Sequence, residues 1–345
     1  MIPVSRPDLS GNEQRYISDA ISSGWISSRG DYVNRFASEF ARWAGNAHAL
    51  PTNSGTSALH AALVGIGIER GDEVIVPALS YIATANAVTY CGATPVFADV
   101  DPETWTMDPA SVEKLVNRRT RALLPVALFG VPADMDALQR IADRCGLWMV
   151  SDAAQAHGAT WDGQPLATQA DVSAYSFYGN KIMTTGEGGM VTTDDPLVHH
   201  AARRYAHQGQ RGMYEHPSVG HNYRMTNLAA AIGLAQLERI DQLLADRAVS
   251  VLYYYDAGLD PAQYCDARGH RAWWQFPYRT PEPAKVVERL AKAGVESRPM
   301  FRPLHRQAHY SGQAPVAEAL SRETMILPLY PAMSRDEVET VVTNL

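Results

Sequence analysis

The sequence predicts an α/β fold, with a mostly parallel central sheet sandwiched by helices and a smaller C-terminal α+β domain. Short apolar strands alternate with helices from about residue 46 to residue 193. These strands are apolar almost throughout, as is typical of parallel strands that helices cover on both faces. The composition changes after a long helical stretch that follows Thr226, so we expect a second domain there.

The elements of the first part follow from the change between strand and helix periodicity. In chain order, the predicted elements are strand 48–50, helix 56–65, strand 73–76, helix 82–90, strand 95–98, helix 112–116, strand 122–126, helix 135–144, strand 147–150, strand 171–177 and strand 189–193.

The second part begins with a predicted helical stretch over residues 228–251, in which leucines and isoleucines recur at three- and four-residue spacing. Further predicted elements are strand 273–278, helix 284–293 and helix 335–345, with an irregular segment rich in Pro, Arg and His at 297–309. We therefore expect a large domain with an N-terminal arm over residues 1–245 and a small domain over residues 246–345.

The composition excludes several classes of protein. The 345 residues are 46% hydrophobic and 19% charged, with a net charge of −7, which argues against a nucleic-acid-binding surface. No run of about 18 uncharged apolar residues occurs, and the amino terminus has no basic region followed by an apolar stretch. Neither membrane insertion nor secretion is indicated.

The three cysteines, Cys91, Cys145 and Cys265, are odd in number and far apart, and Cys145 lies in a helical pattern. We expect buried free thiols rather than disulfides or metal ligands, and hence a reducing compartment, the cytoplasm.

One lysine lies in unusual surroundings. Lys181 belongs to a stretch rich in glycine and hydroxyl residues at 176–190, on the connection between two predicted strands. From Ala174 to Thr193 the only other charged side chain is that of Glu187. An ordinary surface lysine usually has more charged neighbours, so Lys181 is a candidate for chemistry.

Three further candidates lie where predicted strands end, at the edge of the sheet at which open α/β folds bind ligands. The turn that contains Gly55 and Thr56 opens a helix and offers backbone N–H groups to a phosphate. Asp152 follows a buried strand, and Tyr81 ends another. Each has an ordinary alternative role: a helix N-cap, a turn cap and a core aromatic residue, respectively.

Pyridoxal phosphate needs all four groups together: a phosphate site, an aromatic surface, a carboxylate for the ring nitrogen and a lysine for the aldehyde. Competing motifs are weak. The glycines at 65–71 miss the dinucleotide-binding spacing by one residue and lie at a helix end. His305 and His309 have a metal-ligand spacing but no carboxylate partner set, so we expect no metal site.

At this point the sequence resembles the StrS-type nucleotide-sugar aminotransferases, a branch of the fold-type I pyridoxal phosphate enzymes. The resemblance covers nearly the whole chain and is carried by seven segments in order. These are 24–30 (GWISSRG), 53–59 (NSGTSAL), 83–88 (ATANAV), 92–99 (GATPVFAD), 152–158 (DAAQAHG), 176–190 (SFYGNKIMTTGEGGM) and 222–227 (NYRMTN).

The resemblance implies a role for each matching residue. Lys181 would bond the aldehyde, Asp152 would bind the pyridine nitrogen, Gln155 the ring hydroxyl and Tyr81 the ring face. The phosphate would be bound by Gly55, Thr56 and Ser176, with Asn222 reaching in from a second subunit of a homodimer. The cofactor would alternate between pyridoxal phosphate and pyridoxamine phosphate, with glutamate as the amino donor.

The family's acceptors are nucleotide-linked keto sugars, and several segments are most similar to the members that aminate GDP-4-keto-6-deoxymannose. Arg29, Arg298 and His305 are candidates to bind the diphosphate, although the ordinary role of any one of them is that of a solvated surface residue. Three departures from the family pattern, Ser151, the segment 127–130 and His221, are expected on the sugar side, so they leave the sugar open.

The resemblance leaves other functions open. The first is amination at another carbon, or of a dTDP- or UDP-linked sugar, which the motifs do not separate. The second is a sugar dehydratase of the same fold, although that group resembles this chain with histidine at the lysine position. The third is a cofactor-binding regulator without turnover, which the intact pair of Lys181 and Asp152 argues against.

Overall fold

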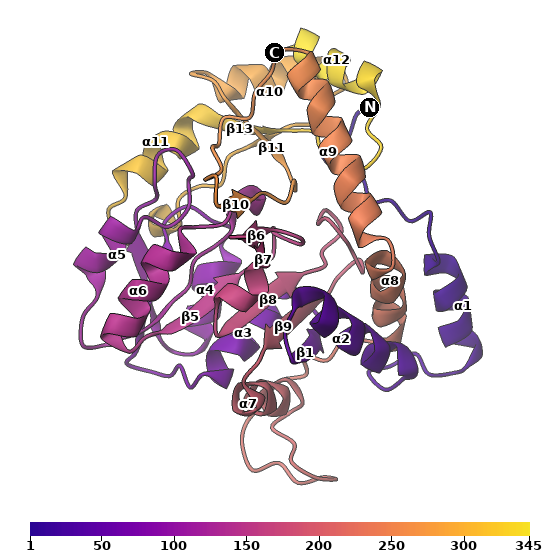
Figure 1. Cartoon of the computed structure of the whole chain (residues 1–345), viewed down its shortest axis with the longest axis vertical. Helices are drawn as coiled ribbons and strands as arrows, with labels where there is room; N and C mark the ends of the chain where they lie inside the picture. The colour runs from indigo at the N-terminus through magenta and orange to yellow at the C-terminus, as the bar shows by residue number, and fades with distance from the viewer.

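The computed structural model describes residues 1–345 and is built around one seven-stranded sheet (Figure 1). The strand order is β1-β9-β8-β5-β4-β2-β3, and every pairing is parallel except those of β9, which runs antiparallel to both β1 and β8. The strands are β1 (His48–Thr52), β2 (Glu73–Pro77), β3 (Thr94–Ala98), β4 (Thr120–Leu123), β5 (Trp148–Asp152), β8 (Val172–Ser176) and β9 (Gly189–Thr193). The mostly parallel sheet predicted from the sequence is confirmed.

Helices cover both faces of this sheet. Figure 1 shows α5 and α6 in front of the sheet and α3 and α4 behind it, while α7 packs against α3. The N-terminal helices α1 and α2 both pack against α8. The helices are α1 (Glu13–Ser22), α2 (Asp31–Ala44), α3 (Gly55–Gly65), α4 (Ala83–Tyr90), α5 (Pro109–Leu115), α6 (Met135–Cys145), α7 (Pro196–Ala206) and α8 (Asn227–Leu237).

The C-terminal part forms a small antiparallel sheet in the order β11-β13-β12 with helices beside it. Its elements are α9 (Ile240–Asp256), β11 (Phe276–Arg279), α10 (Pro283–Lys292), β12 (Arg298–Pro299), α11 (Pro315–Glu323), β13 (Thr324–Leu327) and α12 (Arg335–Thr343). A third sheet, β10-β6-β7, joins β6 (Thr160–Trp161) and β7 (Gln164–Pro165) to β10 (Gly269–His270). Short 3₁₀ helices occur at Leu128–Gly130, Leu166–Gln169 and Leu304–Arg306.

Two hydrophobic cores hold the chain together. The larger contains 77 buried residues and surrounds the main sheet, and the smaller contains 13 buried residues between Val251 and Val341. The division of the chain at residue 245 stays a prediction, since α9 runs across that position without a break.

The single helical stretch expected over 228–251 is wrong, because it is two helices that meet at Glu238 and Arg239. Neither residue is a helix breaker by itself. The Glu238 carboxylate accepts hydrogen bonds from Asn12 and Tyr16, and the Arg239 guanidinium donates to Asp8, so contacts with the N-terminal arm stabilise the change of direction.

The strand expected over 273–278 begins only at Phe276, which is a second correction. The carbonyl of Trp274 does not enter a ladder, because it accepts a hydrogen bond from the buried side chain of Arg247 instead.

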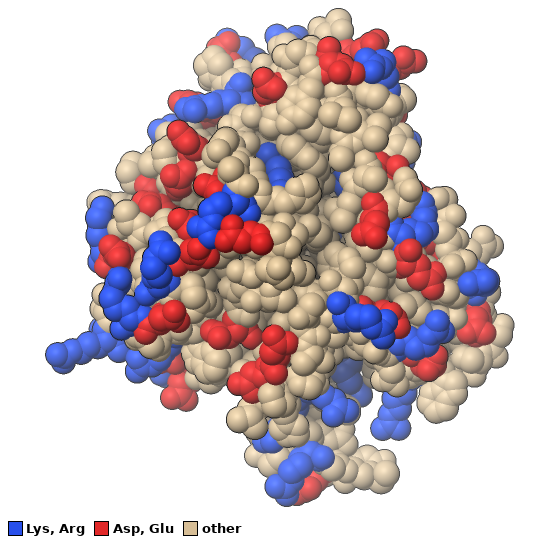
Figure 2. Space-filling view, viewed as in Figure 1, with Lys and Arg blue, Asp and Glu red and all other residues tan.

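Lysine and arginine side chains are interspersed with aspartate and glutamate on the face shown in Figure 2. Exposed pairs of this kind contribute on the order of 0–1 kcal/mol each, so the two apolar cores carry most of the stability. No helix of the chain combines the length and the apolar character that crossing a membrane requires.

Candidate active site

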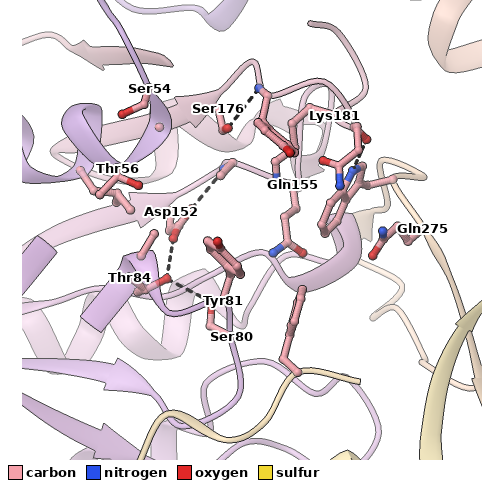
Figure 3. A pocket seen from close by; sticks show the side chains of 18 of the residues that line it. Ser54, Thr56, Ser80, Tyr81, Thr84, Asp152, Gln155, Ser176, Lys181 and Gln275 are labelled. Carbon is pink, nitrogen blue, oxygen red and sulfur yellow. Dashed lines mark hydrogen bonds between the residues drawn. The ribbon is translucent and has the colours of Figure 1, made fainter. Parts of the chain in front are cut away.

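A cavity of about 460 Å³ opens at the carboxyl ends of the parallel strands, between the main sheet and the C-terminal part. Its lining comes from segments far apart in the sequence (Figure 3). Seven of the eight predicted cofactor-site residues line it, namely Gly55, Thr56, Tyr81, Asp152, Gln155, Ser176 and Lys181, and the predicted substrate residue Arg298 lines it as well.

Lys181 lies on the loop between β8 and β9, as the sequence predicted. Its side chain is half-buried, and its Nζ lies 3.8 Å from the centre of the Trp274 ring. Burial lowers the pKa of Lys181 from 10.5 to about 8, although the charge of Asp152 acts in the opposite direction. A larger fraction of this lysine is therefore neutral near neutral pH than of an exposed lysine, and a neutral amine is what a nucleophile or a base requires.

Asp152 is the last residue of β5, and only 4% of it is exposed. Its Oδ2 accepts a hydrogen bond of 2.8 Å from the Thr84 hydroxyl, and its Oδ1 accepts one from the Ala154 N–H. Burial raises the pKa of Asp152, while these hydrogen bonds and the charge of Lys181 lower it. A buried carboxylate with this raised pKa is stabilised by a cationic partner, and a protonated pyridine nitrogen in the cavity is such a partner.

The phosphate cradle is formed by the turn between β1 and α3. Ser54 caps α3 by accepting a hydrogen bond from the Ser57 N–H, which leaves the N–H groups of Gly55 and Thr56 at the helix end. A Cβ atom on Gly55 would lie 2.6 Å from Cβ of Ser176, at the end of β8. Only glycine therefore fits here, and the close approach brings the Ser176 hydroxyl to the same helix end.

Gln155 is buried, and its amide is oriented by the backbone of a neighbouring loop. Its Oε1 accepts a hydrogen bond of 2.7 Å from the Phe129 N–H. Phe129 has a φ of 52°, in the left-handed region, so this loop is held in an uncommon conformation. Because the oxygen is occupied, the amide nitrogen of Gln155 is the group left to donate to a ring hydroxyl.

Aromatic side chains line one side of the cavity. Tyr81 is 58% exposed and lies edge-on to Phe301, and Phe129 stacks against both Phe301 and Trp274. Tyr81 therefore presents an open ring at the cavity rather than packing in the core, as a stacking surface requires. The donor set and the glycine cradle fit pyridoxal phosphate.

The three candidates for diphosphate binding lie in different places. Arg298 is at the cavity, where the Glu296 carboxylate accepts a hydrogen bond of 2.9 Å from its guanidinium. Arg29 is exposed and does not line the cavity. The prediction for His305 is wrong, because its side chain is fully buried and its Nε2 lies 3.0 Å from the Glu318 carboxylate. Because His305 packs against α11, its side chain does not line the cavity.

Asn222 does not line the cavity of its own chain. It lies exposed in the segment between α7 and α8, where its Oδ1 accepts hydrogen bonds from Arg224. This placement leaves Asn222 available to another copy of the chain, which is what the resemblance implied.

Several residues of the site had no predicted role. Ser80 and Thr84 form a hydroxyl pair at 3.1 Å that leads to Asp152, and Trp274 and Gln275 line the cavity from the C-terminal part. Thr84 belongs to the family-like segment 83–88, so the resemblance was a sequence signal for Thr84 as a site residue. The sequence pattern indicates Trp274 only as part of a strand.

Among known proteins, the model of the DegT/DnrJ/EryC1/StrS aminotransferase family matches residues 7–345. The GDP-perosamine synthase of Caulobacter vibrioides is 42% identical, and the match covers 100% of this chain and 97% of the relative. The GDP-perosamine synthase of Escherichia coli O157:H7 is 38% identical, with 98% and 95% covered.

Among solved structures, that of S. venezuelae DesV in complex with a ketimine intermediate is 36% identical. It superimposes with a TM-score of 0.91 over 96% of this chain and 93% of that chain. The chain therefore belongs to the DegT/DnrJ/EryC1/StrS aminotransferase family, whose members are pyridoxal-phosphate-dependent enzymes.

Proposed function

We propose that this protein transfers an amino group from glutamate to GDP-4-keto-6-deoxymannose and so produces GDP-perosamine, with pyridoxal phosphate as its cofactor. The observation that carries the aminotransfer is that Lys181 and Asp152 line one cavity together with the phosphate cradle at Gly55. The choice of sugar is supported by the GDP-perosamine synthases that match this chain over nearly its whole length.

Each residue of the cofactor site has a separate task. When bound, the cofactor supplies an electron sink for charge that develops on the reacting carbon. Asp152 holds the proton on the pyridine nitrogen, because its buried carboxylate is stabilised by a positive partner. Gln155 donates to the ring hydroxyl, and Tyr81 covers one face of the ring. Gly55, Thr56 and Ser176 bind the phosphate.

Lys181 has two tasks. Its neutral amine would hold the cofactor at the aldehyde, and whenever Nζ is free it would carry a proton to or from the reacting carbon. The lowered pKa of about 8 suits both tasks, since an appreciable fraction of the amine is neutral near neutral pH and the ammonium still donates a proton.

The sugar nucleotide enters from the open side of the cavity, where Arg298 offers a cation to its diphosphate. The Glu296 carboxylate keeps this guanidinium in place, and it also accepts a hydrogen bond of 2.9 Å from the Val4 N–H. The N-terminal segment therefore supports the position of Arg298.

The active unit that we propose is a homodimer with shared active sites. Asn222 lies on the segment between α7 and α8 that projects at the bottom of Figure 1. This segment carries Met213, Tyr214 and Val219, which are almost fully exposed. Exposed apolar side chains on a projecting segment suit contact with a second copy, which would bring Asn222 to the partner's phosphate site.

The cytoplasm remains the predicted compartment. All three cysteines are free, which supports a reducing environment. The expected burial is wrong, because Cys145 is exposed and Cys91 and Cys265 are only half-buried.

A panel of sugar nucleotides tests the proposal. The purified protein, loaded with pyridoxal phosphate and supplied with glutamate, is incubated with GDP-, dTDP- and UDP-linked keto sugars, and amine products are measured by mass spectrometry. We expect amination of GDP-4-keto-6-deoxymannose and none with Lys181→Ala. A preference for a dTDP- or UDP-linked sugar would refute the substrate, and no amination of any sugar would refute the sugar aminotransferase.

A further inference from the structure

The catalytic lysine lies against a tryptophan that has no assigned role. Nζ of Lys181 is 3.8 Å from the centre of the Trp274 ring, well within the roughly 6 Å over which a cation and an aromatic face attract one another. Trp274 is 3% exposed and comes from the segment before β11, in the C-terminal part of the chain.

Trp274 is held in this position from two directions. Its Nε1–H donates a hydrogen bond of 2.7 Å to the carbonyl of Asn180, the residue that precedes the lysine. This hydrogen bond attaches the indole to the loop that carries Lys181, and the face of the same ring lies against the Lys181 ammonium. Stacking on Phe129 at 6.0 Å between ring centres covers the indole further.

A buried arginine joins the two backbones. The guanidinium of Arg247, on α9, donates to the carbonyl of Trp274 at 3.0 Å and to the carbonyl of Lys181 at 3.2 Å. Arg247 is 1% exposed, and its three hydrogen-bond acceptors are all backbone carbonyls. Its contacts set the separation of the lysine loop from the tryptophan segment.

We propose that Trp274 is a positioning residue whose indole face receives the ammonium of Lys181 whenever that amine is not bonded to the cofactor. This inference rests on the proposed function, in which Lys181 is released in each half-reaction and must stay close to the reacting carbons. The indole face limits where the free side chain goes, and it stabilises the charged amine in a site where burial disfavours charge.

Other charged groups also act on Lys181. Asp152 stabilises its charge from β5, and Glu187 and Arg298 line the same cavity. His157 and Arg247 lie behind the lysine loop. A substitution at Trp274 changes none of these charged groups. It does remove the hydrogen bond from Nε1–H to the Asn180 carbonyl, which both methionine and phenylalanine lack, so the comparison of these two substitutions isolates the aromatic face.

The test measures how fast the cofactor-free protein captures pyridoxal phosphate as the pH is varied. In this step the neutral Nζ of Lys181 bonds to the aldehyde carbon, and its two protons leave with the aldehyde oxygen as water. The rate, followed by stopped-flow absorbance, rises with pH as the ammonium loses its proton, and its midpoint reports the pKa of Lys181 in the empty site.

Three variants separate the aromatic face from simple packing. Trp274→Met removes the face but keeps much of the buried volume, and Trp274→Phe keeps a ring. Trp273→Leu is the matched control, because the neighbouring indole contacts Arg271 at 4.0 Å rather than the lysine. Thermal unfolding of each variant is recorded in parallel, so that a loss of stability is seen separately.

We expect Trp274→Met to lower the midpoint by about 0.5–1 pH unit, because the charged amine loses its aromatic partner. Trp274→Phe should recover most of this shift, and Trp273→Leu should leave the midpoint unchanged. A midpoint that is unchanged or higher in Trp274→Met would overturn this inference but would leave the proposed function standing. Failure of the unaltered protein to capture pyridoxal phosphate would overturn the proposed function together with it.

Discussion

The hydroxyl of Thr84 donates a hydrogen bond of 2.8 Å to Oδ2 of Asp152, across 68 residues of sequence. Thr84 in turn lies 3.1 Å from the Ser80 hydroxyl, so two hydroxyls orient one buried carboxylate (Figure 3). Hydrogen bonds to a charged group contribute about 1.5–3 kcal/mol. The orientation of the carboxylate that we propose to bind the pyridine nitrogen thus depends on a residue outside the predicted site.

We predict that Thr84→Val weakens pyridoxal phosphate binding about tenfold or more, since about 1.4 kcal/mol corresponds to a factor of ten. Valine has the same shape but leaves Oδ2 of Asp152 without its partner. The dissociation constant is measured by fluorescence titration. Thr84→Ser keeps the hydroxyl and should bind almost as the unaltered protein does, and equal weakening by both substitutions would contradict the prediction.

Gly55→Ala should weaken binding of the cofactor phosphate. The added Cβ would lie 2.6 Å from the Ser176 Cβ, so α3 has to move away from β8. Overpacking of this kind costs about 1–3 kcal/mol, which corresponds to an increase of roughly tenfold to a hundredfold in the dissociation constant of pyridoxal phosphate. Calorimetric titration measures it.

The control for Gly55→Ala is Gly179→Ala, on the neighbouring lysine loop. A Cβ there has its nearest neighbour, the Gly186 carbonyl oxygen, at 4.0 Å, so it fits without movement. If both alanines weaken the cofactor equally, the close contact between Gly55 and Ser176 is not the cause.

Arg298→Met should raise the KM for the sugar nucleotide about tenfold and leave the affinity for pyridoxal phosphate unchanged, because it removes a cation from the cavity rim. Steady-state kinetics and a cofactor titration are measured side by side. Arg279→Met is the control, since Arg279 is an exposed arginine paired with Glu323. An unchanged KM in Arg298→Met would remove Arg298 from the substrate site.

Stability should fall as the pH is lowered from 6.5. His157 is completely buried beside the rings of Tyr175 and Phe177, and burial, together with the charge of Lys181, lowers its pKa to about 3. Between pH 6.5 and about 3 the unfolded chain binds a proton at His157 that the folded chain does not bind. The free energy of unfolding therefore decreases by up to about 1.4 kcal/mol per pH unit.

Urea denaturation at several pH values measures this decrease. His157→Gln should make the free energy of unfolding less dependent on pH. His270→Gln, at an exposed histidine, should leave this pH dependence unchanged. Part of the slope should remain in His157→Gln, because burial also lowers the pKa of His60, to about 4. A slope unaffected by His157→Gln would show that His157 does not resist protonation in the folded protein.

Mixing two inactive variants tests the shared active site. If Asn222 acts in the partner's site, a heterodimer of Lys181→Ala and Asn222→Ala contains one intact site. An equal mixture should then recover about a quarter of the activity, because half of the randomly assembled dimers are heterodimers with one working site. If both residues served the same chain, the mixture would remain inactive after subunit exchange.

The residues that lie at strand ends were predictable from the sequence alone. The connection that carries Lys181, the position of Asp152 at the end of β5 and the glycine turn before α3 all follow from local periodicity. Because parallel strands end at the same edge of a sheet, local positions were enough to bring these groups together. The family-like segments then assigned their chemistry.

Other features were decided only when distant segments packed together. Trp274 reaches the lysine loop across 94 residues from Asn180, His305 is buried against Glu318, and contacts of Asn12 and Asp8 accompany the change of direction between α8 and α9. No periodicity of the chain encodes these partners. They depend on which side chains meet in the folded protein, because burial and long-range hydrogen bonds, rather than local propensity, determine their energies.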